Sequence, residues 1–337
     1  MQSDLNKILI ESMLKKAVKD IQSSPGRTVR NLIDLGVNFS KGRFQKRFLS
    51  VVQEMLQNPE SAYYTLFTDI TQNVDMDLLM QFGMNLGYNS CTQGAKIIRQ
   101  IEAEKEFNVP WSLTLGMDSE KLYTDPECYA SILQQGVSMG IYTYFLFLPS
   151  GDAEKLMPLL EGQPDCAFVI FLRGHQITER FMERAKKSKN VMIAVDKDTE
   201  MPDVCAKLRD HKMLFAIYQR YLDGDVEEVI SDHWISEVQQ YHPQMALLAA
   251  HPSCSDQTRK RVYEHVHAVR ESQKQRVLFI DLVGDAWQID QIISEDAFVV
   301  GFDRDGNMSA YDGVRKDAGY NIFHSTLEEV LQNAIKK

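Results

Sequence analysis

Charged and polar side chains stand at the ends of several short apolar runs in this chain of 337 residues, and they are its candidates for chemistry. Aspartate and histidine hold divalent metals that activate water, and arginine grips a carboxylate or phosphate with two hydrogen bonds. The same residue types also cap helices and close turns, which requires no ligand. The residues that we select as a candidate pocket are Asp118, Arg173, His175, Asp196, Gln219, His251 and Asp281.

Sequence motifs that identify a known chemistry are missing. The only His-x-His pair, His265 and His267, falls in a helical stretch, where the two side chains point to different faces. No G-x-G-x-x-G, G-x-x-x-x-G-K-[ST] or G-x-S-x-G pattern occurs. No two of the five cysteines lie closer than 37 residues apart, so a local zinc or iron–sulfur motif is absent. The catalytic residues stay unassigned, and we expect neither a metal site nor a bound cofactor.

The elements that must position these side chains are short strands separated by sequence of helix length. Strands that alternate with helices form parallel βαβ units, and about seven such units predict an α/β fold with a (β/α) barrel or a partial barrel of the TIM type. Reactive groups of such barrels lie at the carboxyl ends of the strands. The predicted strands are Ser112–Leu115, Tyr142–Leu148, Ala167–Leu172, Val191–Val195, Met213–Tyr218, Met245–Ala250 and Val277–Leu282.

The chain divides into two regions that differ in their hydrophobic pattern. Residues 1–105 contain no convincing strand and read as a helical N-terminal region, whereas residues 106–337 carry the barrel. Asn89 or Ser90 is a suitable cap for a helix from Thr92 to about Glu104. The other helices predicted in the N-terminal region are Leu5–Ala17, Thr28–Leu35, Phe44–Leu56, Ala62–Ile70 and Met76–Leu86.

The C-terminal part of the barrel region is predicted to contain a hairpin and a last helix. The hairpin covers residues 298–311 and has Asp305-Gly306 in its turn. The last helix covers residues 325–336, and Ser325 and Glu328 fit a capping box at its start.

Composition and charge exclude several classes of function. No segment approaches the roughly 18 consecutive apolar residues that span a membrane. The first twenty residues lack the apolar core of a signal peptide, so we expect a cytoplasmic protein with no membrane partner. The formal net charge of −10 argues against a broad nucleic-acid-binding face, which needs a basic surface.

Several weak motifs, taken in order, point to one family. They are Asn85-Leu-Gly-Tyr-Asn89, Gly94-Ala-Lys-Ile-Ile-Arg99, Asn108-Val-Pro-Trp111, the segment 132–142, Val277-Leu-Phe-Ile-Asp281, the turn at Asp305-Gly306-Asn307, and the segment 321–331. Over about residues 40–337 the chain resembles the radical S-adenosylmethionine (radical SAM) proteins, in the group with a helical N-terminal extension. The resemblance implies a radical-SAM-type barrel.

The departures from that family concern its chemistry. The family holds a [4Fe–4S] cluster with C-x3-C-x2-C after the first strand, but here the corresponding loop, Gly116–Thr124, contains no cysteine. The family's Gly-Gly-Glu-Pro segment, which contacts the amine of SAM, is replaced by Leu148-Pro-Ser-Gly-Asp152. The positions of Thr-Asn-Gly and Ser-x-Glu-Gly read Leu172-Arg-Gly174 and Val195-Asp-Lys-Asp198. A cluster without thiolates has nothing to hold its irons, so radical SAM activity is not expected.

Two functions remain open from the sequence. The first is a degenerate radical-SAM-like barrel, a pseudoenzyme that acts as a binding, regulatory or partner protein toward a protein or peptide. The alternative is a barrel enzyme with different, metal-assisted or metal-free chemistry, whose groups at the carboxyl ends of the strands converge in one pocket.

Overall fold

The computed structural model describes residues 43–294, 298–310 and 313–334, together with isolated positions before residue 43. The helix predicted at Leu5–Ala17 therefore lies largely outside the described residues, whereas the described positions of Thr28–Leu35, which are Thr28, Arg30, Asn31, Ile33 and Asp34, are helical as predicted. Tyr311, at the end of the predicted hairpin, and the last residues of the C-terminal helix also lie outside the described residues.

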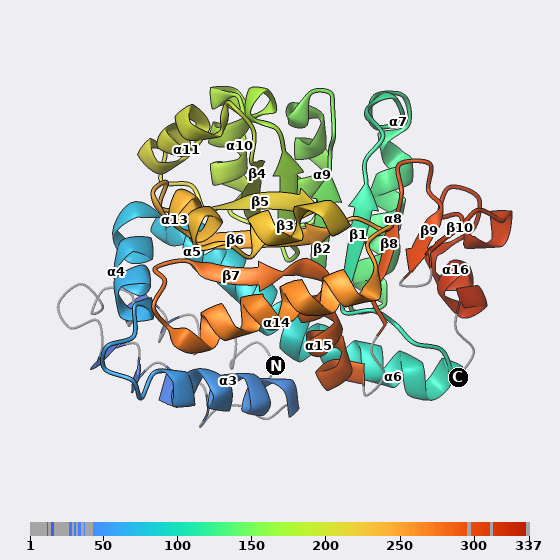
Figure 1. The fold of residues 1–337 in the computed structure, drawn as a ribbon. Helices are drawn as coiled ribbons and strands as arrows, with labels where there is room; N and C mark the ends of the chain where they lie inside the picture. Colours follow the sequence, from blue (N-terminus) through green and yellow to red (C-terminus); the bar gives the residue numbers. More distant parts are fainter. Residues whose placement is uncertain are drawn as a thin grey trace.

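The protein is built on one curled sheet of ten strands, an open half-barrel (Figure 1). The strand order is β10-β9-β8-β1-β2-β3-β4-β5-β6-β7, so β7 and β8 do not pair with each other and the barrel is not closed. Strands β1 to β8 run parallel, and β9 and β10 continue the sheet antiparallel. The strands are β1 (Ser112–Gly116), β2 (Thr143–Phe147), β3 (Ala167–Leu172), β4 (Val191–Asp196), β5 (Phe215–Tyr221), β6 (Met245–Ala250), β7 (Leu278–Asp281), β8 (Val300–Phe302), β9 (Met308–Ala310) and β10 (Gly313–Arg315).

All seven strands predicted for the barrel are present, and helices connect them as βαβ units require. Helices before the sheet are α3 (Arg43–Met55), α4 (Tyr63–Asn73), α5 (Met76–Met84), η1 (Asn85–Gly94) and α6 (Ala95–Lys105). Those that follow are α7 (Ser119–Thr124), α8 (Pro126–Ser138), η2 (Ala153–Leu156), α9 (Met157–Glu161), η3 (Gly174–Gln176), α10 (Glu179–Ser188), α11 (Met201–Asp210), η4 (Asp223–Asp225), α12 (Val226–Val229), α13 (Asp232–Gln239), α14 (Asp256–Ser272), α15 (Leu282–Ser294), η5 (Ala318–Tyr320) and α16 (Leu327–Ala334).

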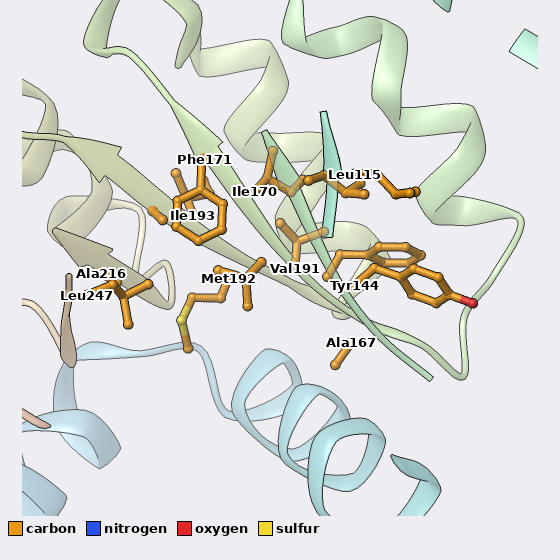
Figure 2. Close-up of a cluster of buried hydrophobic side chains, with 14 of the residues drawn as sticks. Leu115, Tyr144, Ala167, Ile170, Phe171, Val191, Met192, Ile193, Ala216 and Leu247 are labelled. Atoms are coloured by element: carbon orange, nitrogen blue, oxygen red, sulfur yellow. The ribbon is translucent and has the colours of Figure 1, made fainter. Parts of the chain in front are cut away.

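The side chains of β2 point alternately to the two faces of the sheet. Tyr144 is buried on the face that carries α8, where its hydroxyl donates to the carbonyls of Leu133 and Ile141. Since successive side chains of a strand point to opposite faces, Phe147 projects to the inner face of the half-barrel. The central strand β3 is buried along its whole length, which fits its continuous apolar sequence. Figure 2 shows part of this core, with Tyr144, Ile170 and Ile193 among the labelled side chains.

The helical region before β1 packs against the sheet and shares its core. Val74, Phe82 and Ile98 belong to the same buried apolar cluster as the strands. The predicted boundary at residues 105 and 106 falls between α6 and β1.

A π-helix, η1, occupies the place where a capped helix start was predicted. Asn89 and Ser90 do not cap a helix at Thr92, because both side chains are used elsewhere. Asn89 donates to the carbonyl of Asp165 at 2.9 Å, and Ser90 shares a 2.6 Å hydrogen bond with Thr143. Helix α6 therefore continues directly from the π-helix, and both polar groups tie it to the amino ends of β2 and β3.

The C-terminal hairpin is confirmed as the antiparallel pair β8 and β9. The predicted capping box is wrong by one residue. Thr326 and Glu329 form it: the Thr326 hydroxyl accepts from the Glu329 amide, and the Glu329 carboxylate accepts from the Thr326 amide at 2.8 Å. Glu328 is instead paired with Lys105 of α6. The third strand of the hairpin sheet, β10, has no counterpart in the prediction.

Candidate functional site

An aromatic cluster lies on the inner face at the carboxyl ends of the central strands. Phe147 of β2 is paired in register with Phe171 of β3, so both side chains share the inner face. Phe171 pairs with Ala194, and Asp196 two residues later pairs with Tyr218 of β5. The sheet register thus brings two phenylalanines and a tyrosine from three strands to one place.

The three rings of this cluster pack closely but differ in burial. The rings of Phe147 and Phe171 are stacked, with centroids 3.9 Å apart and planes 7° apart. Tyr218 lies perpendicular to both, at 4.9 Å from Phe171 and 6.1 Å from Phe147. Phe171 is buried, whereas Phe147 and Tyr218 are only half-buried. Solvent therefore reaches Phe147 and Tyr218 but not the buried Phe171 ring.

Two guanidinium groups and one carboxylate surround the aromatic cluster. The Arg220 guanidinium carbon lies 5.6 Å from the centroid of Phe147, a cation–π distance. Burial raises the pKa of Asp196, with Asp198 adding to the rise, while the charges of Arg173 and Arg220 oppose it. Burial also raises the pKa of Tyr218 to about 12, with Asp196 adding to the effect. The Asp196 carboxylate therefore lies within electrostatic reach of both arginines.

Both guanidiniums are exposed, and neither forms an ion pair or a hydrogen bond with a side chain or backbone group in the described part of the chain. This contrasts with Arg270, which makes a two-pronged pair with Asp285 at 2.6 and 2.8 Å. Arg173 and Arg220 thus keep their N–H groups available for a ligand.

A shallow cavity of about 380 Å³ opens beside this cluster. Its lining residues are Arg173, His175, Asp196, Asp198, Thr199 and Glu200. His175 faces Glu200 at 3.6 Å, and Asp198 accepts a hydrogen bond from the Gly174 amide at 3.3 Å. Three of the seven side chains selected from the sequence therefore lie at one cavity.

Three other predicted residues have structural contacts outside that cavity. Asp118 caps α7 by accepting a 2.7 Å hydrogen bond from the Lys121 amide. The Gln219 amide donates to Glu228 at 3.2 Å and accepts from the indole of Trp234. His251 shares a 2.7 Å hydrogen bond with Ser253 in the loop after β6. These contacts match the alternative reading of the residues as caps and turn formers.

Asp281, the seventh predicted residue, is buried at the end of β7 and caps α15. Its carboxylate accepts from the Gly284 amide at 2.6 Å and from the Tyr221 hydroxyl at 3.1 Å. Tyr221 pairs in register with Ala250 and neighbours Arg220 in the sequence, so its side chain lies on the opposite face of β5 from the aromatic cluster. Asp281 is thus separated from the cavity by the sheet.

The burial of Asp281 predicts a pH-dependent contribution to stability. Burial raises its pKa from 3.8 to about 6. The folded protein keeps this proton where the unfolded chain has lost it, so the contribution is complete below pH 3.8 and is lost as the pH rises through about 6. Between these two pH values the free energy of unfolding of the wild type should fall by an amount on the order of 2–3 kcal/mol because of Asp281. We expect Asp281→Asn, which keeps an acceptor for Gly284 and gains a donor for Tyr221, to lack this fall.

Urea titrations at several pH values between 4 and 8 measure this effect. Glu183→Gln, on the exposed side of α10, is the matched control and should retain the wild-type slope. An Asp281→Asn protein with an unchanged pH profile would show that Asp281 is ionised throughout this range.

The cysteines do not fit an iron–sulfur cluster. The loop after β1 contains none and folds into α7, which Asp118 caps. Cys91, Cys166, Cys205 and Cys254 are buried on separate elements, and only Cys128 on α8 is half-buried. Burial raises the pKa of the Cys91, Cys166 and Cys205 thiols to about 12, which disfavours the thiolate that binds iron. Across the described residues, no group of three or more His, Cys, Asp or Glu side chains is arranged to hold a metal ion.

Sequence reasoning selected Arg173 and Asp196 but missed the aromatic side chains beside them. Phe147, Phe171 and Tyr218 lie inside apolar runs and read as ordinary core residues. The sequence signal that could have found the site is the spacing of Tyr218 and Arg220. Both lie in β5, which extends to Tyr221, and side chains two residues apart in a strand share a face. The inner-face register between strands was needed to bring them to Phe147.

Among the residues that the structure describes, no helix combines the length and the apolar character needed to cross a membrane. Comparison with models of known protein families finds no match to this chain, and comparison with curated proteins finds none either.

Proposed function

We propose that this protein is a radical-SAM-like half-barrel that has no iron–sulfur cluster and works as a non-catalytic binding protein. The observation that carries the proposal is the end of β1, where the loop expected to hold a cluster is a short, cysteine-free helix capped by Asp118. The open half-barrel, the helices before it and the C-terminal hairpin fit the scaffold that the resemblance implies.

The proposed ligand site is the carboxyl edge of β2 to β5. The half-exposed stack of Phe147 and Phe171, the guanidiniums of Arg173 and Arg220, and the carboxylate of Asp196 all lie there. Ligands of parallel α/β sheets bind at this edge, because the loops that follow the strands leave a crevice there. A binding protein needs only such recognition groups. The same site could also take a group of this kind that belongs to a protein or peptide partner.

The alternative of a barrel enzyme requires the candidate residues to converge. Arg173, His175 and Asp196 lie at one cavity, but Asp118, Gln219, His251 and Asp281 make contacts elsewhere. His175 is held toward Glu200 rather than toward Asp196 as an acid–base partner. This arrangement favours recognition over catalysis.

The proposal predicts weak binding of SAM. The acceptors that a radical SAM protein offers to the ammonium group of SAM are replaced here by Leu148-Pro-Ser-Gly-Asp152. An unmatched donor in a partly dry site costs about 1–3 kcal/mol, and the cluster that holds the same amino and carboxyl groups has no ligands. We therefore expect a dissociation constant above about 1 mM, which corresponds to roughly −4 kcal/mol.

Isothermal titration calorimetry with SAM measures this constant. Micromolar affinity would contradict the proposed loss of the SAM site. The same titration on Asp152→Ala, at the exposed position that replaces the family's segment, shows whether any residual heat comes from this loop.

A further inference from the structure

We infer that the edge of the half-barrel binds a flat organic anion, a ring system that carries a carboxylate, phosphate or similar acidic group. This inference rests on the proposed function and names the class of ligand for the same site. It stands on two features together: a partly exposed aromatic stack with a guanidinium over one ring, and two arginines near it whose N–H groups have no partner within the described residues.

The aromatic stack selects for a flat ring. Phe171 fills the buried side of Phe147, and Tyr218 stands perpendicular to both rings as a wall. Phe147 and Tyr218 keep partly exposed surface, and the Arg220 guanidinium lies over the Phe147 ring, so a ligand ring there would lie against the aromatic side chains and the guanidinium together. Stacking of a planar ring on an aromatic side chain contributes about 1–3 kcal/mol by alanine substitution.

The two arginines select for an anion. Arg220 is held near the Phe147 ring, so a ligand ring at Phe147 brings its substituents within reach of this guanidinium. A guanidinium binds a carboxylate or a phosphate with two parallel hydrogen bonds. Arg173 adds a second positive charge that also acts on Asp196. Asp196, Asp198 and Glu200 line the cavity at Arg173, whereas Arg220 is not part of that lining, so Arg220 is the guanidinium expected to meet the anion first.

The remaining groups restrict what the ligand is. The Asp196 carboxylate feels the charges of both guanidiniums, and its oxygens can accept a hydrogen bond from a hydroxyl or amino group on the ring. The short extent of the cluster and the acidic chain favour a small molecule over a polynucleotide, whose backbone needs an extended basic surface.

The test uses 8-anilinonaphthalene-1-sulfonate, a flat fluorescent anion, with the full-length protein. We expect one saturable site, and Arg220→Gln and Phe147→Leu should each weaken its affinity at least about tenfold, equivalent to about 1.4 kcal/mol. Arg220→Lys, which keeps the charge but loses the two-pronged bond, should fall between wild type and Arg220→Gln. N-phenyl-1-naphthylamine, which has the rings without the sulfonate, should bind at least tenfold more weakly.

The matched control is Arg276→Gln. Arg276 is exposed and precedes β7, so it lies at the amino edge of the sheet, away from the cluster. Both Arg276→Gln and wild type should bind the probe equally. Far-UV circular dichroism and a melting curve of each variant show whether it is folded. Leucine at position 147 keeps most of the apolar volume of phenylalanine, so Phe147→Leu should fold.

Three results overturn the inference: no saturable binding to wild type, equal affinity in folded Arg220→Gln and Phe147→Leu, or equal affinity for the uncharged analogue. These failures differ from failure of the proposed function. If SAM binds weakly and one of these three results is found, the protein can still be a binding protein, but its ligand is not a flat organic anion. Micromolar SAM binding would instead contradict the proposed function itself.

Discussion

Replacing Asp290 by alanine is expected to lower the free energy of unfolding by about 2–6 kcal/mol. Asp290 on α15 is fully buried, and its carboxylate accepts from the backbone amides of Trp111 at 3.0 Å and Phe298 at 2.6 Å. These residues lead into β1 and β8, so one side chain fixes the entry of two neighbouring strands. Alanine leaves both amides buried without an acceptor, and each costs about 1–3 kcal/mol.

The pH of the measurement changes the size of this effect. Burial raises the pKa of Asp290 to about 7, although both amides favour its ionised form. Below that pH the protonated acid still offers two oxygens and carries no desolvated charge, so alanine should cost most near pH 5 and less near pH 8. Urea unfolding at both pH values tests this, with Glu183→Ala on exposed α10 as the control. A loss below about 1 kcal/mol at pH 5 would mean that the amides find other acceptors.

Gly94→Ala is expected to destabilise the protein by about 3 kcal/mol, at the upper end of the usual cost of overpacking. A β-carbon at Gly94, the last residue of the π-helix, would lie 2.2 Å from the carbonyl oxygen of Gly140. Backbone has to move to relieve that contact. Gly140 has a φ of 92° and is itself closely approached by Gly94, so neither segment moves easily.

Gly87 provides the control for this prediction because it lies in the same π-helix and a β-carbon there meets nothing within 4 Å. Gly87→Ala should change stability by no more than about 1 kcal/mol, and a small gain is expected from the lost backbone freedom. Thermal and chemical unfolding of the two variants measure the difference. Equal stability of Gly94→Ala and Gly87→Ala would show that the contact between η1 and the turn before β2 is loose.

Much of the fold could be predicted because its signals are local. The run Ala167–Leu172 predicts both ends of β3 correctly, since a strand of a parallel sheet is buried on both faces and has no polar alternation. Hairpin β8–β9 follows from the Asp305-Gly306 turn, where Gly306 has a φ of 81°. The helix start after Asn89 was wrong because that side chain serves a tertiary contact with Asp165, which no local pattern contains.

The site was only partly predictable for the same reason. Arg173 and Asp196 were selected because polar residues that follow apolar runs mark strand ends. Asp281 also follows such a run, but its partner Tyr221 lies on the opposite face of β5 from the cluster. Phe147 looked like core, since its exposure results from the open curvature of the sheet, which depends on strand number and register rather than on local sequence.

Anaerobic reconstitution with iron and sulfide, followed by iron analysis and an absorbance spectrum, tests whether this barrel can hold an iron–sulfur cluster. We expect no stoichiometric iron and no charge-transfer absorbance at about 400 nm, because the loop Gly116–Thr124 has no thiolate and four of the five cysteines are buried on separate elements. A stoichiometric [4Fe–4S] centre that cleaves SAM would contradict this expectation, and would identify the protein as a working radical enzyme with cluster ligands of another kind.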